Sequence, residues 1–504
     1  MSNRAAAGPA VPSGAALSAM IEALEAGLLE RDTAARLLLL AAVAGEHVLL
    51  LGPPGTAKSE LARRLQRVIE PLASSGTTVC FERLLTRFST PEELFGPLSL
   101  KALEDDRYER LVDGYLPTAQ VAFLDEVFKA NSAILNALLT LLNERVFDNG
   151  TQRLPVPLVT VVGASNETPE DEALQAFHDR FLLRVPVQPV SDAAFGALLA
   201  HSLSDAEDPA HKLGAAQRQA VQAAAASVAL SPAALQALHS LRALLRAPAD
   251  PPATAPGSSP TDGRLETVAM SHAVAAAGVS DRRWRALARL LRVAAAAEQR
   301  TAVEPCDLWL AAFVTTVDAP GLARVLHWWQ HELLQVPGAD APGWRHSTEA
   351  FEKQLEIETL AQAEGGAEAA GKMALARSVG GAEGSGSASQ MLRLYSARVE
   401  ERLRKRWSPL HIRARVGQVQ ALREAVQAAH EQAQITWAHW QPKLLGRLWL
   451  PPSLAQATLA PLAQRLALLE ALLQRLRAAE QGFSALPVDE NLAEMPAPMA
   501  VPPS

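Results

Sequence analysis

The sequence predicts an α/β module with a mostly parallel sheet covered on both faces, followed by a long region that is almost entirely helical. Apolar runs of strand length occur in "EHVLLLGPPG" (46–55), "QVAFLDE" (120–126) and "LVTVVGASNE" (158–167), and helix-like segments separate them. This alternation is typical of parallel sheets. A glycine-rich loop joins the first run to the helical segment "KSELARRLQRVIE" (58–70). From Pro189 onward, apolar residues recur at helical spacing, which predicts an all-α region.

Composition restricts the class of protein. The 504 residues suffice for about three or four domains. The net charge of −7 gives no global positive field, so nucleic-acid binding is not expected. The two cysteines, Cys80 and Cys306, form neither a disulfide framework nor a metal cluster. We find no secretory signal and no transmembrane segment, since no apolar run reaches the roughly 18 residues of a membrane span, and we expect a cytoplasmic location.

The remaining segments of the N-terminal part complete the α/β module. Residues 1–15 are rich in Ala, Pro and Gly, and we expect them to be flexible. Residues 16–44 read as two short helices broken near "LERD", and "SAILNALLTLLNERVF" (132–147) reads as a long amphipathic helix. The module is therefore expected to span residues 16–189.

The loop after the first strand has the groups that a triphosphate site requires. Such a site needs inward-pointing backbone N–H groups, a helix N-terminus, one cation and one hydroxyl. Lys58 would lie on the β- and γ-phosphates of ATP, and Ser59 would coordinate Mg²⁺. Ala57 stands where such loops often have glycine, and it would cost little if its φ were below zero. The expected ATP-binding residues of this loop are Gly52, Pro53, Pro54, Gly55, Thr56, Ala57, Lys58 and Ser59.

Polar side chains end the two later strand runs. Asp125 is expected to hold Mg²⁺ together with Ser59, and the adjacent Glu126 to polarise the attacking water. Asn166 can hydrogen-bond both that water and the γ-phosphate. A strand end with two solvated acids is the simpler interpretation of Asp125 and Glu126, but the loop upstream disfavours it. Lys58, Glu126 and Asn166 are therefore candidate catalytic residues.

Four arginines are candidates for contacting phosphate. Arg180 could reach the nucleotide of a neighbouring subunit and stabilise charge on the transferred phosphoryl group. A salt bridge with Asp179 is the alternative for Arg180, and it is favoured for Arg184. Ser280 is an expected helix N-cap that places Arg282 and Arg283 in the first turn, where cations oppose the helix dipole. A bound phosphate would explain these two arginines.

Together these elements resemble the AAA+ ATPases, and within them the MoxR family. The stretches "GPPGTAKSELARRL", "RFSTPEELFGPLSLKALEDDRYERLVDGYLPTAQVAFLDEVFKANSAILNALLTLLNERVFDNG" and "ASNE" carry the resemblance. That family commonly has alanine at the position of Ala57. More narrowly, "TRFSTPEELFGPLSL" and "SDRRWRALARLLRVAA" resemble the RavA (regulatory ATPase variant A) group. The resemblance covers about residues 16–330.

The resemblance implies a role for each candidate. Gly52–Ser59 would be Walker A, Asp125 and Glu126 Walker B, and Asn166 sensor 1. Arg180 would be the arginine finger and Arg282 the sensor 2 residue of an all-α lid at residues 190–309, which contains a Pro-rich loop at 247–263. Residues 86–118 would be an insertion around helix 2, with "RYERLVDGYLP" (107–117) as a hairpin over a central pore. Residues 146–156 would form the hairpin before sensor 1.

The C-terminal part is expected to be a helical module at residues 310–482, interrupted by a Gly/Ala-rich segment at 363–389. The RavA group carries a compact β-rich insertion that contacts a lysine decarboxylase, but residues 343–392 offer no alternating strand pattern. The decarboxylase partnership is therefore not carried over. Residues 483–504 are expected to form a disordered tail.

The resulting functional hypothesis is an ATPase that uses ATP and Mg²⁺ in a homo-hexameric ring. The family acts in chaperone-like remodelling or maturation of client proteins, including metal or cofactor insertion, with a partner that bears a von Willebrand factor A domain. The alternatives are a nucleotide-gated assembly scaffold and a nucleic-acid motor. The sequence does not name the client.

Overall fold

The computed structural model describes residues 11–72, 78–167, 172–200, 209–247, 279–334, 343–360 and 406–496. The chain divides into two compact units. The first unit comprises Met1–Gln335 and Lys443–Gln456, and the second comprises Val336–Pro442 and Ala457–Ser504. Neither unit is continuous in sequence, because a short segment late in the chain belongs to the first unit.

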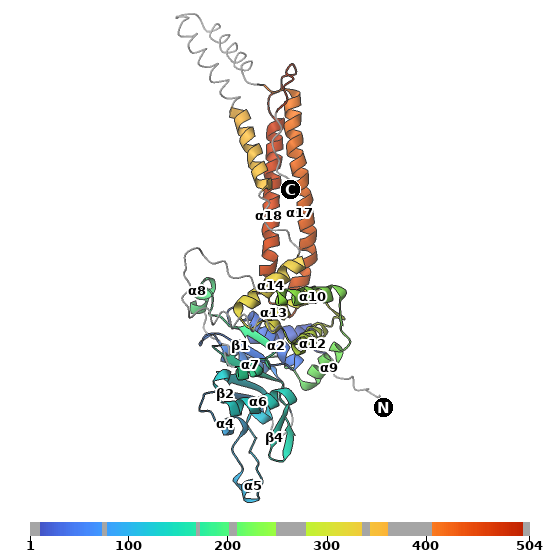
Figure 1. The fold of residues 1–504 in the computed structure, drawn as a ribbon. Helices are drawn as coiled ribbons and strands as arrows, with labels where there is room; N and C mark the ends of the chain where they lie inside the picture. Colours follow the sequence, from blue (N-terminus) through green and yellow to red (C-terminus); the bar gives the residue numbers. More distant parts are fainter. Residues whose placement is uncertain are drawn as a thin grey trace, which may run out of the picture. The chain divides into compact units, whose positions relative to one another are not determined.

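A five-stranded parallel sheet forms the centre of the first unit, with strand order β2-β3-β6-β1-β7 (Figure 1). The predicted parallel sheet is thus confirmed, and three of its strands match the predicted apolar runs. The sequence did not reveal β2, in which polar residues interrupt the apolar ones, or the four-residue β7. The strands are β1 (Val48–Leu51), β2 (Thr78–Leu84), β3 (Ala119–Asp125), β6 (Thr160–Ser165) and β7 (Leu183–Pro186).

Helices pack on both faces of the sheet. Two short helices precede β1, α1 (Gly14–Glu25) and α2 (Asp32–Ala44), as the sequence predicts. α2 and α3 (Lys58–Val68) contact the central strands on one face. On the other face, α6 (Ser132–Glu144) and α7 (Glu172–His178) share a core with alternate strand residues. Examples of that core are Leu49, Leu124 and Val161 from the strands, and Leu138 and Phe177 from the helices.

The segment between β2 and β3 is the expected insertion, but its hairpin is not where the sequence placed it. Backbone bonds join Ser99 N to Glu109 O at 2.8 Å and Leu111 N to Pro97 O at 2.9 Å. These bonds bracket a short helix, α5 (Leu100–Glu104), so residues 97–111 form the hairpin instead of 107–117. The prediction failed because a helical turn, which its sequence did not signal, occupies the tip. α4 (Pro91–Phe95) and the 3-10 turn η1 (Leu116–Thr118) flank this hairpin.

A second hairpin follows α6. β4 (Val146–Asn149) and β5 (Gln152–Pro155) pair antiparallel, and Gly150 at their turn has φ +64°. A Cβ at Gly150 would lie 2.0 Å from the carbonyl oxygen of Tyr108. Glycine is therefore required there both by the turn and by the close approach of the insertion. β4 also shortens the long helix predicted over 132–147, because α6 ends at Glu144.

The helical part of the first unit extends further than predicted. Arg184 on β7 donates to Thr316 O at 3.1 Å, and Arg283 donates to Val314 O at 2.9 Å. Residues 310–334 therefore belong to the first unit and not to the C-terminal module. Most of the Pro-rich loop at 247–263 lies outside the described residues. The helices of this part are α8 (Asp192–Ala200), α9 (Ala215–Ala225), α10 (Pro232–Arg246), α12 (Asp281–Ala297), α13 (Leu310–Thr315) and α14 (Ala319–Leu334).

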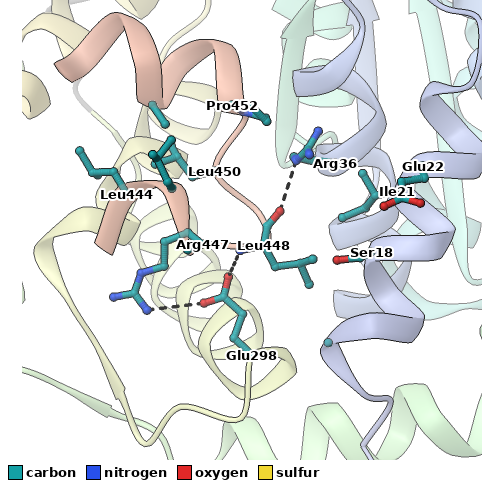
Figure 2. A pocket seen from close by; sticks show the side chains of 14 residues that line it. Ser18, Ile21, Glu22, Arg36, Glu298, Leu444, Arg447, Leu448, Leu450 and Pro452 are labelled. Atoms are coloured by element: carbon teal, nitrogen blue, oxygen red, sulfur yellow. Dashed lines mark hydrogen bonds and ion pairs between the residues drawn. The ribbon is translucent and has the colours of Figure 1, made fainter. Parts of the chain in front are cut away.

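A bend at residues 446–451 joins the two longest described helices, α17 (Pro409–Leu445) and α18 (Pro452–Ser484), and it belongs to the first unit. The indole of Trp449 is buried and donates to Ala294 O at 3.1 Å. Leu448 N donates to Glu298 at 2.8 Å, and Arg36 donates to Leu448 O at 3.2 Å (Figure 2). A cavity of about 440 Å³ lies between this bend, α1 and α2. Its lining contains no residue of the phosphate loop, so the cavity is separate from the expected nucleotide site.

The second unit is helical, as predicted. Residues 343–360, α17 (Pro409–Leu445) and α18 (Pro452–Ser484) supply its helices, the bend between the last two belonging to the first unit. The Gly/Ala-rich segment 363–389 lies outside the described residues. No helix in the described part of the chain has the length and apolarity that a membrane crossing needs.

The expected disordered tail is partly ordered. Leu486 is buried, Trp407 N donates to Pro487 O at 2.8 Å, and Asp489 N donates to Trp407 O at 2.9 Å. Ser408 also donates to the carbonyl of Glu494. The prediction was wrong for this stretch because its few apolar side chains find a core and its backbone finds a partner segment. Residues 497–504 lie outside the described part.

Candidate functional site

The phosphate loop joins the carboxyl end of β1 to the first turn of α3. Gly52 N donates to Ser165 O at 3.1 Å, which ties the start of the loop to the neighbouring strand β6. A Cβ at Gly52 would lie 2.0 Å from Val187 O, a backbone atom that cannot move aside easily. Glycine is therefore required at position 52 by packing against the chain that leaves β7.

Ala57 adopts a conformation that the sequence analysis did not anticipate. Its φ is +67° and its ψ is +23°, in the left-handed region, where it forms the N-cap of α3. The argument that alanine costs little rested on a negative φ and is wrong. An L-residue with a Cβ pays about 1–2 kcal/mol in this region. The loop keeps its shape with a strained residue at the helix start.

The loop offers several donors to an anion. In the described part of the chain, no backbone N–H from Gly55 to Ser59 donates to a backbone carbonyl. Lys58 Nζ donates to Gly52 O at 2.7 Å and to Pro53 O at 2.8 Å, inside the curve of the loop. Burial lowers the pKa of Lys58, which the carboxylates of Asp125 and Glu126 partly counteract. Unpaired N–H groups, a helix N-terminus and a confined cation fit phosphate.

Three predicted residues meet at the carboxyl end of the sheet. Asn166 follows β6, the strand between β1 and β3, and its Oδ1 lies 3.3 Å from Lys58 Nζ. Asn166 Nδ2 donates to Glu126 Oε1 at 2.8 Å. Glu126 also pairs with Lys129 at 3.3 Å. The structure thus joins the candidate lysine, asparagine and general base in one contact chain.

The expected Mg²⁺ ligands provide the right kind of atoms. Asp125 ends β3 next to β6, and Ser59 is the second residue of α3. Asp125 Oδ1 accepts from Glu126 N at 3.0 Å, which leaves its second oxygen available. A hydroxyl and a carboxylate oxygen are donors that Mg²⁺ prefers. The residues present therefore fit an oxygen-coordinated cation beside the phosphate loop.

The structure separates the two arginines that follow α7. Asp179 pairs with Arg283 at 2.9 Å and with Arg184 at 3.6 Å, so it is not engaged with Arg180. Arg184 is buried on β7, where desolvation and the nearby Arg283 lower its pKa to about 9. Among the described residues, no side-chain hydrogen bond or ion pair involves Arg180. Arg180 thus has no partner among the described residues, although its Nε is buried, whereas Arg184 is held within its own chain.

Arg282 and Arg283 lie at the amino end of the sheet, opposite the phosphate loop. Arg283 is buried and donates to Asp179 and to Leu182 O, just before β7 begins. Arg282 is exposed and contacts Asn143 at the end of α6, at 3.3 Å. The predicted N-cap is present, because Ser280 Oγ accepts from Arg283 N. The structure does not bring Arg282 to the phosphate loop of its own chain, because α12 begins beside the starts of the strands.

Comparison with known families agrees with this geometry. Residues 15–225 match the MoxR domain of the MoxR-vWA-beta-propeller ternary systems, and residues 266–316 match an AAA lid domain. Residues 15–225 are thus similar to a MoxR domain, and residues 266–316 to an AAA lid. The match covers the sheet, the phosphate loop and the carboxylates of β3.

Three proteins are similar to this chain over about a third of its length. Two uncharacterized proteins of Methanocaldococcus jannaschii are 51% identical over 170 residues, which cover 34% of this chain and 44% and 43% of theirs. The chain therefore spans less than half the length of these relatives. A structural protein of Acidianus two-tailed virus is 31% identical over 170 residues, 33% of this chain and 26% of its own.

Two solved structures resemble the chain more distantly. A candidate ATPase from Cytophaga hutchinsonii has a TM-score of 0.46 at 17% identity, covering 64% of this chain and 95% of its own. A full-length MCM homologue from Methanopyrus kandleri has a TM-score of 0.37 at 15% identity, covering 63% of this chain and 59% of its own.

Sequence reasoning missed one residue that holds the phosphate loop. Arg31 is buried, and its guanidinium donates to Thr56 O at 3.1 Å and to Gln188 O at 2.8 Å. It thereby links the loop to the chain after β7. Arg31 lies between Glu30 and Asp32 at the break between two helices, so no signal in the sequence indicated this role. Nothing in its spacing relates it to residue 56 or residue 188.

Proposed function

We propose that this protein is an ATPase that hydrolyses ATP with Mg²⁺ in a ring of six copies. The observation that carries the proposal is the contact chain from Lys58 through Asn166 to Glu126 at the carboxyl end of the sheet. It joins a phosphate-binding cation, an amide and a general base in one site. The MoxR domain match supports the same activity.

The side chains divide the chemistry between them. Lys58 would leave the carbonyls of Gly52 and Pro53 for the β- and γ-phosphates, because charged oxygens are stronger acceptors. Glu126, held by Asn166, would orient water and accept its proton. Bound Mg²⁺, held by Ser59 and Asp125, would neutralise charge on the phosphate oxygens.

A ring follows from the placement of the arginines. The phosphate loop lies at the carboxyl end of the sheet, whereas Arg180 and the exposed Arg282 lie at the amino end. Both can approach a nucleotide only on another copy, whose carboxyl end faces this amino end. Repeating one such head-to-tail contact generates a ring when the rotation between copies closes, and we propose that it closes here. We therefore propose that Arg180 and Arg282 act on the neighbour's nucleotide, which revises the expectation that Arg282 contacts ATP in its own chain.

The catalytic assignment is tested by replacing Glu126 with Gln. The variant should bind ATP with unchanged affinity and lose turnover at least a hundredfold, because a general base contributes about 10²–10⁴. Lys129→Gln serves as a control, since Lys129 contacts the same carboxylate but has no assigned chemistry. Hydrolysis by the Glu126→Gln protein at the normal rate would contradict the assignment.

The neighbour-directed role of Arg180 has a separate test by mixing two inactive variants. Subunits with Arg180→Ala keep Glu126, and subunits with Glu126→Gln keep Arg180. In equimolar mixed rings, about one quarter of the interfaces would combine both intact residues, so about one quarter of wild-type activity should return. No recovery would mean that Arg180 acts within its own chain or not on nucleotide.

For the cellular role, we propose remodelling or maturation of a client protein together with a von Willebrand factor A domain partner. The matched family is described from ternary systems that also contain a beta-propeller, which makes a propeller protein a second candidate partner. Such partners should co-purify and change the rate of ATP hydrolysis. Stimulation by single-stranded DNA instead would favour a nucleic-acid motor, and full client function of the Glu126→Gln ring would favour a scaffold.

A further inference from the structure

The helix α8 is apolar but buries none of its side chains. Its sequence "DAAFGALLA" has one charged residue, Asp192, and none of its residues is buried. Phe195 is 53% exposed, Leu198 44% and Leu199 72%. Surface helices normally bury an apolar stripe against a core. An apolar helix without a partner in its own described chain indicates a contact with another molecule.

The start of α8 is attached to the nucleotide site. Ser191, which precedes the helix, donates its N–H to Glu30 at 2.8 Å and its hydroxyl to the same carboxylate. Arg31, which follows Glu30 in the chain, holds the phosphate loop by donating to Thr56 O. Gln188 O accepts from Arg31 as well, so the chain between β7 and α8 runs along the loop. α8 therefore begins at the carboxyl end of the sheet, beside the expected ATP.

This position determines which partner is available. Under the proposed function, on which this inference rests, the amino end of a neighbouring copy must approach the carboxyl end of this sheet. Arg282 and Arg285 are exposed on one face of α12 at the amino end, and Arg289 extends this face while pairing with Glu46 at 3.9 Å. The start of α8 presents Asp192 and Glu30. The neighbouring copy thus offers cations where this copy has carboxylates.

We propose that α8 is a subunit contact, buried in the assembled ring by the amino end and α12 of the neighbouring copy. Phe195, Leu198 and Leu199 supply its apolar part, and Asp192 supplies charge complementary to the arginine face of α12. The contact adjoins the nucleotide, so ATP and the apolar surface hold the same two subunits together. Ring assembly and nucleotide binding are then linked through residues 188–191, because Arg31 and Glu30 connect this segment to the phosphate loop.

The test uses the full chain with Phe195→Glu and Leu199→Glu combined. Because α8 buries no side chain in its own chain, the variant should keep the wild-type unfolding temperature. It should bind a fluorescent, non-hydrolysable ATP analogue with unchanged affinity at a dilution where wild type is monomeric. Its assembly with that analogue and Mg²⁺, followed by sedimentation velocity, should require at least tenfold more protein. Ile435→Glu is the control, since Ile435 is 64% exposed on α17. This variant should assemble at the same protein concentration as wild type.

Each other outcome has a definite meaning. Assembly of the double variant at wild-type concentrations overturns the inference about α8 and leaves the proposed function intact. A lowered unfolding temperature of the monomer also overturns it, because α8 would then pack on its own chain. If wild type neither assembles nor hydrolyses ATP, the proposed function fails and this inference fails with it. A cross-link between Leu199→Cys in one copy and Arg285→Cys in another, formed with the ATP analogue, would support the contact directly.

Discussion

Replacing Ala57 with Gly should stabilise the protein, although glycine usually destabilises. Ala57 has φ +67°, a conformation that costs a residue with a Cβ about 1–2 kcal/mol. Glycine removes that strain but loses about 0.5–1 kcal/mol through its greater freedom in the unfolded chain. The difference is a net gain of about 0.5–1 kcal/mol in the free energy of unfolding.

The assay is thermal unfolding of the nucleotide-free protein, followed by calorimetry. A gain of this size should raise the unfolding temperature of the first unit by about 1–3 °C. Ala223→Gly is the matched control, because Ala223 is an exposed residue of α9 with helical backbone. It should lose about 0.5–1 kcal/mol. If both variants are destabilised by the same amount, Ala57 does not adopt a left-handed conformation in solution and the reasoning is refuted.

Three further predictions concern His47, Gly52 and Arg31. Burial lowers the pKa of His47 from 6.5 to about 3. The contribution of the neutral imidazole to the free energy of unfolding is therefore complete above pH 6.5, and about 2 kcal/mol of it is lost at pH 5. In urea titrations at pH 5 and pH 7, the free energy of unfolding should change less with pH for His47→Gln than for wild type. Gly52→Ala places a Cβ 2.0 Å from Val187 O and should cost about 1–3 kcal/mol of stability and abolish ATP-analogue binding. Arg31→Met leaves Thr56 O without its donor and should weaken ATP binding about tenfold with little change in kcat; equal affinity would show that the loop holds its shape unaided.

How far the sequence predicted the fold depended on the pattern of each strand. β1, β3 and β6 are buried on both faces, so each is a continuous apolar run that stands out. β2 lies at the edge of the sheet and contains Glu82 and Arg83, which interrupt its pattern. β7 has only four residues, too few for any periodicity. The order of the tail near Leu486 was not predictable either, because this stretch bonds to the distant residue Trp407.

The site was predictable where the functional residues lie close together in the sequence. The phosphate loop, Asp125 and Glu126 each belong to one short stretch, and parallel strands bring their carboxyl ends together. Arg31 was missed because its acceptor Thr56 O is a backbone atom 25 residues away, which leaves no mark on residue type. For Arg282 the sequence supplied the helix and its cap, but the end of the sheet that α12 approaches depends on tertiary packing.

The bend that carries Trp449 has a consequence for synthesis of the chain. The first unit is interrupted after Gln335 and resumes at Lys443–Gln456, so its last buried side chains leave the ribosome long after the rest. At about 5–20 residues per second, the 107 residues in between (336–442) take ~5–21 s. During that interval the surfaces around Ala294 and Glu298 that later receive Trp449 and Leu448 are open to solvent. Stop codons placed before and after the bend should therefore give nascent chains that differ sharply in protease resistance.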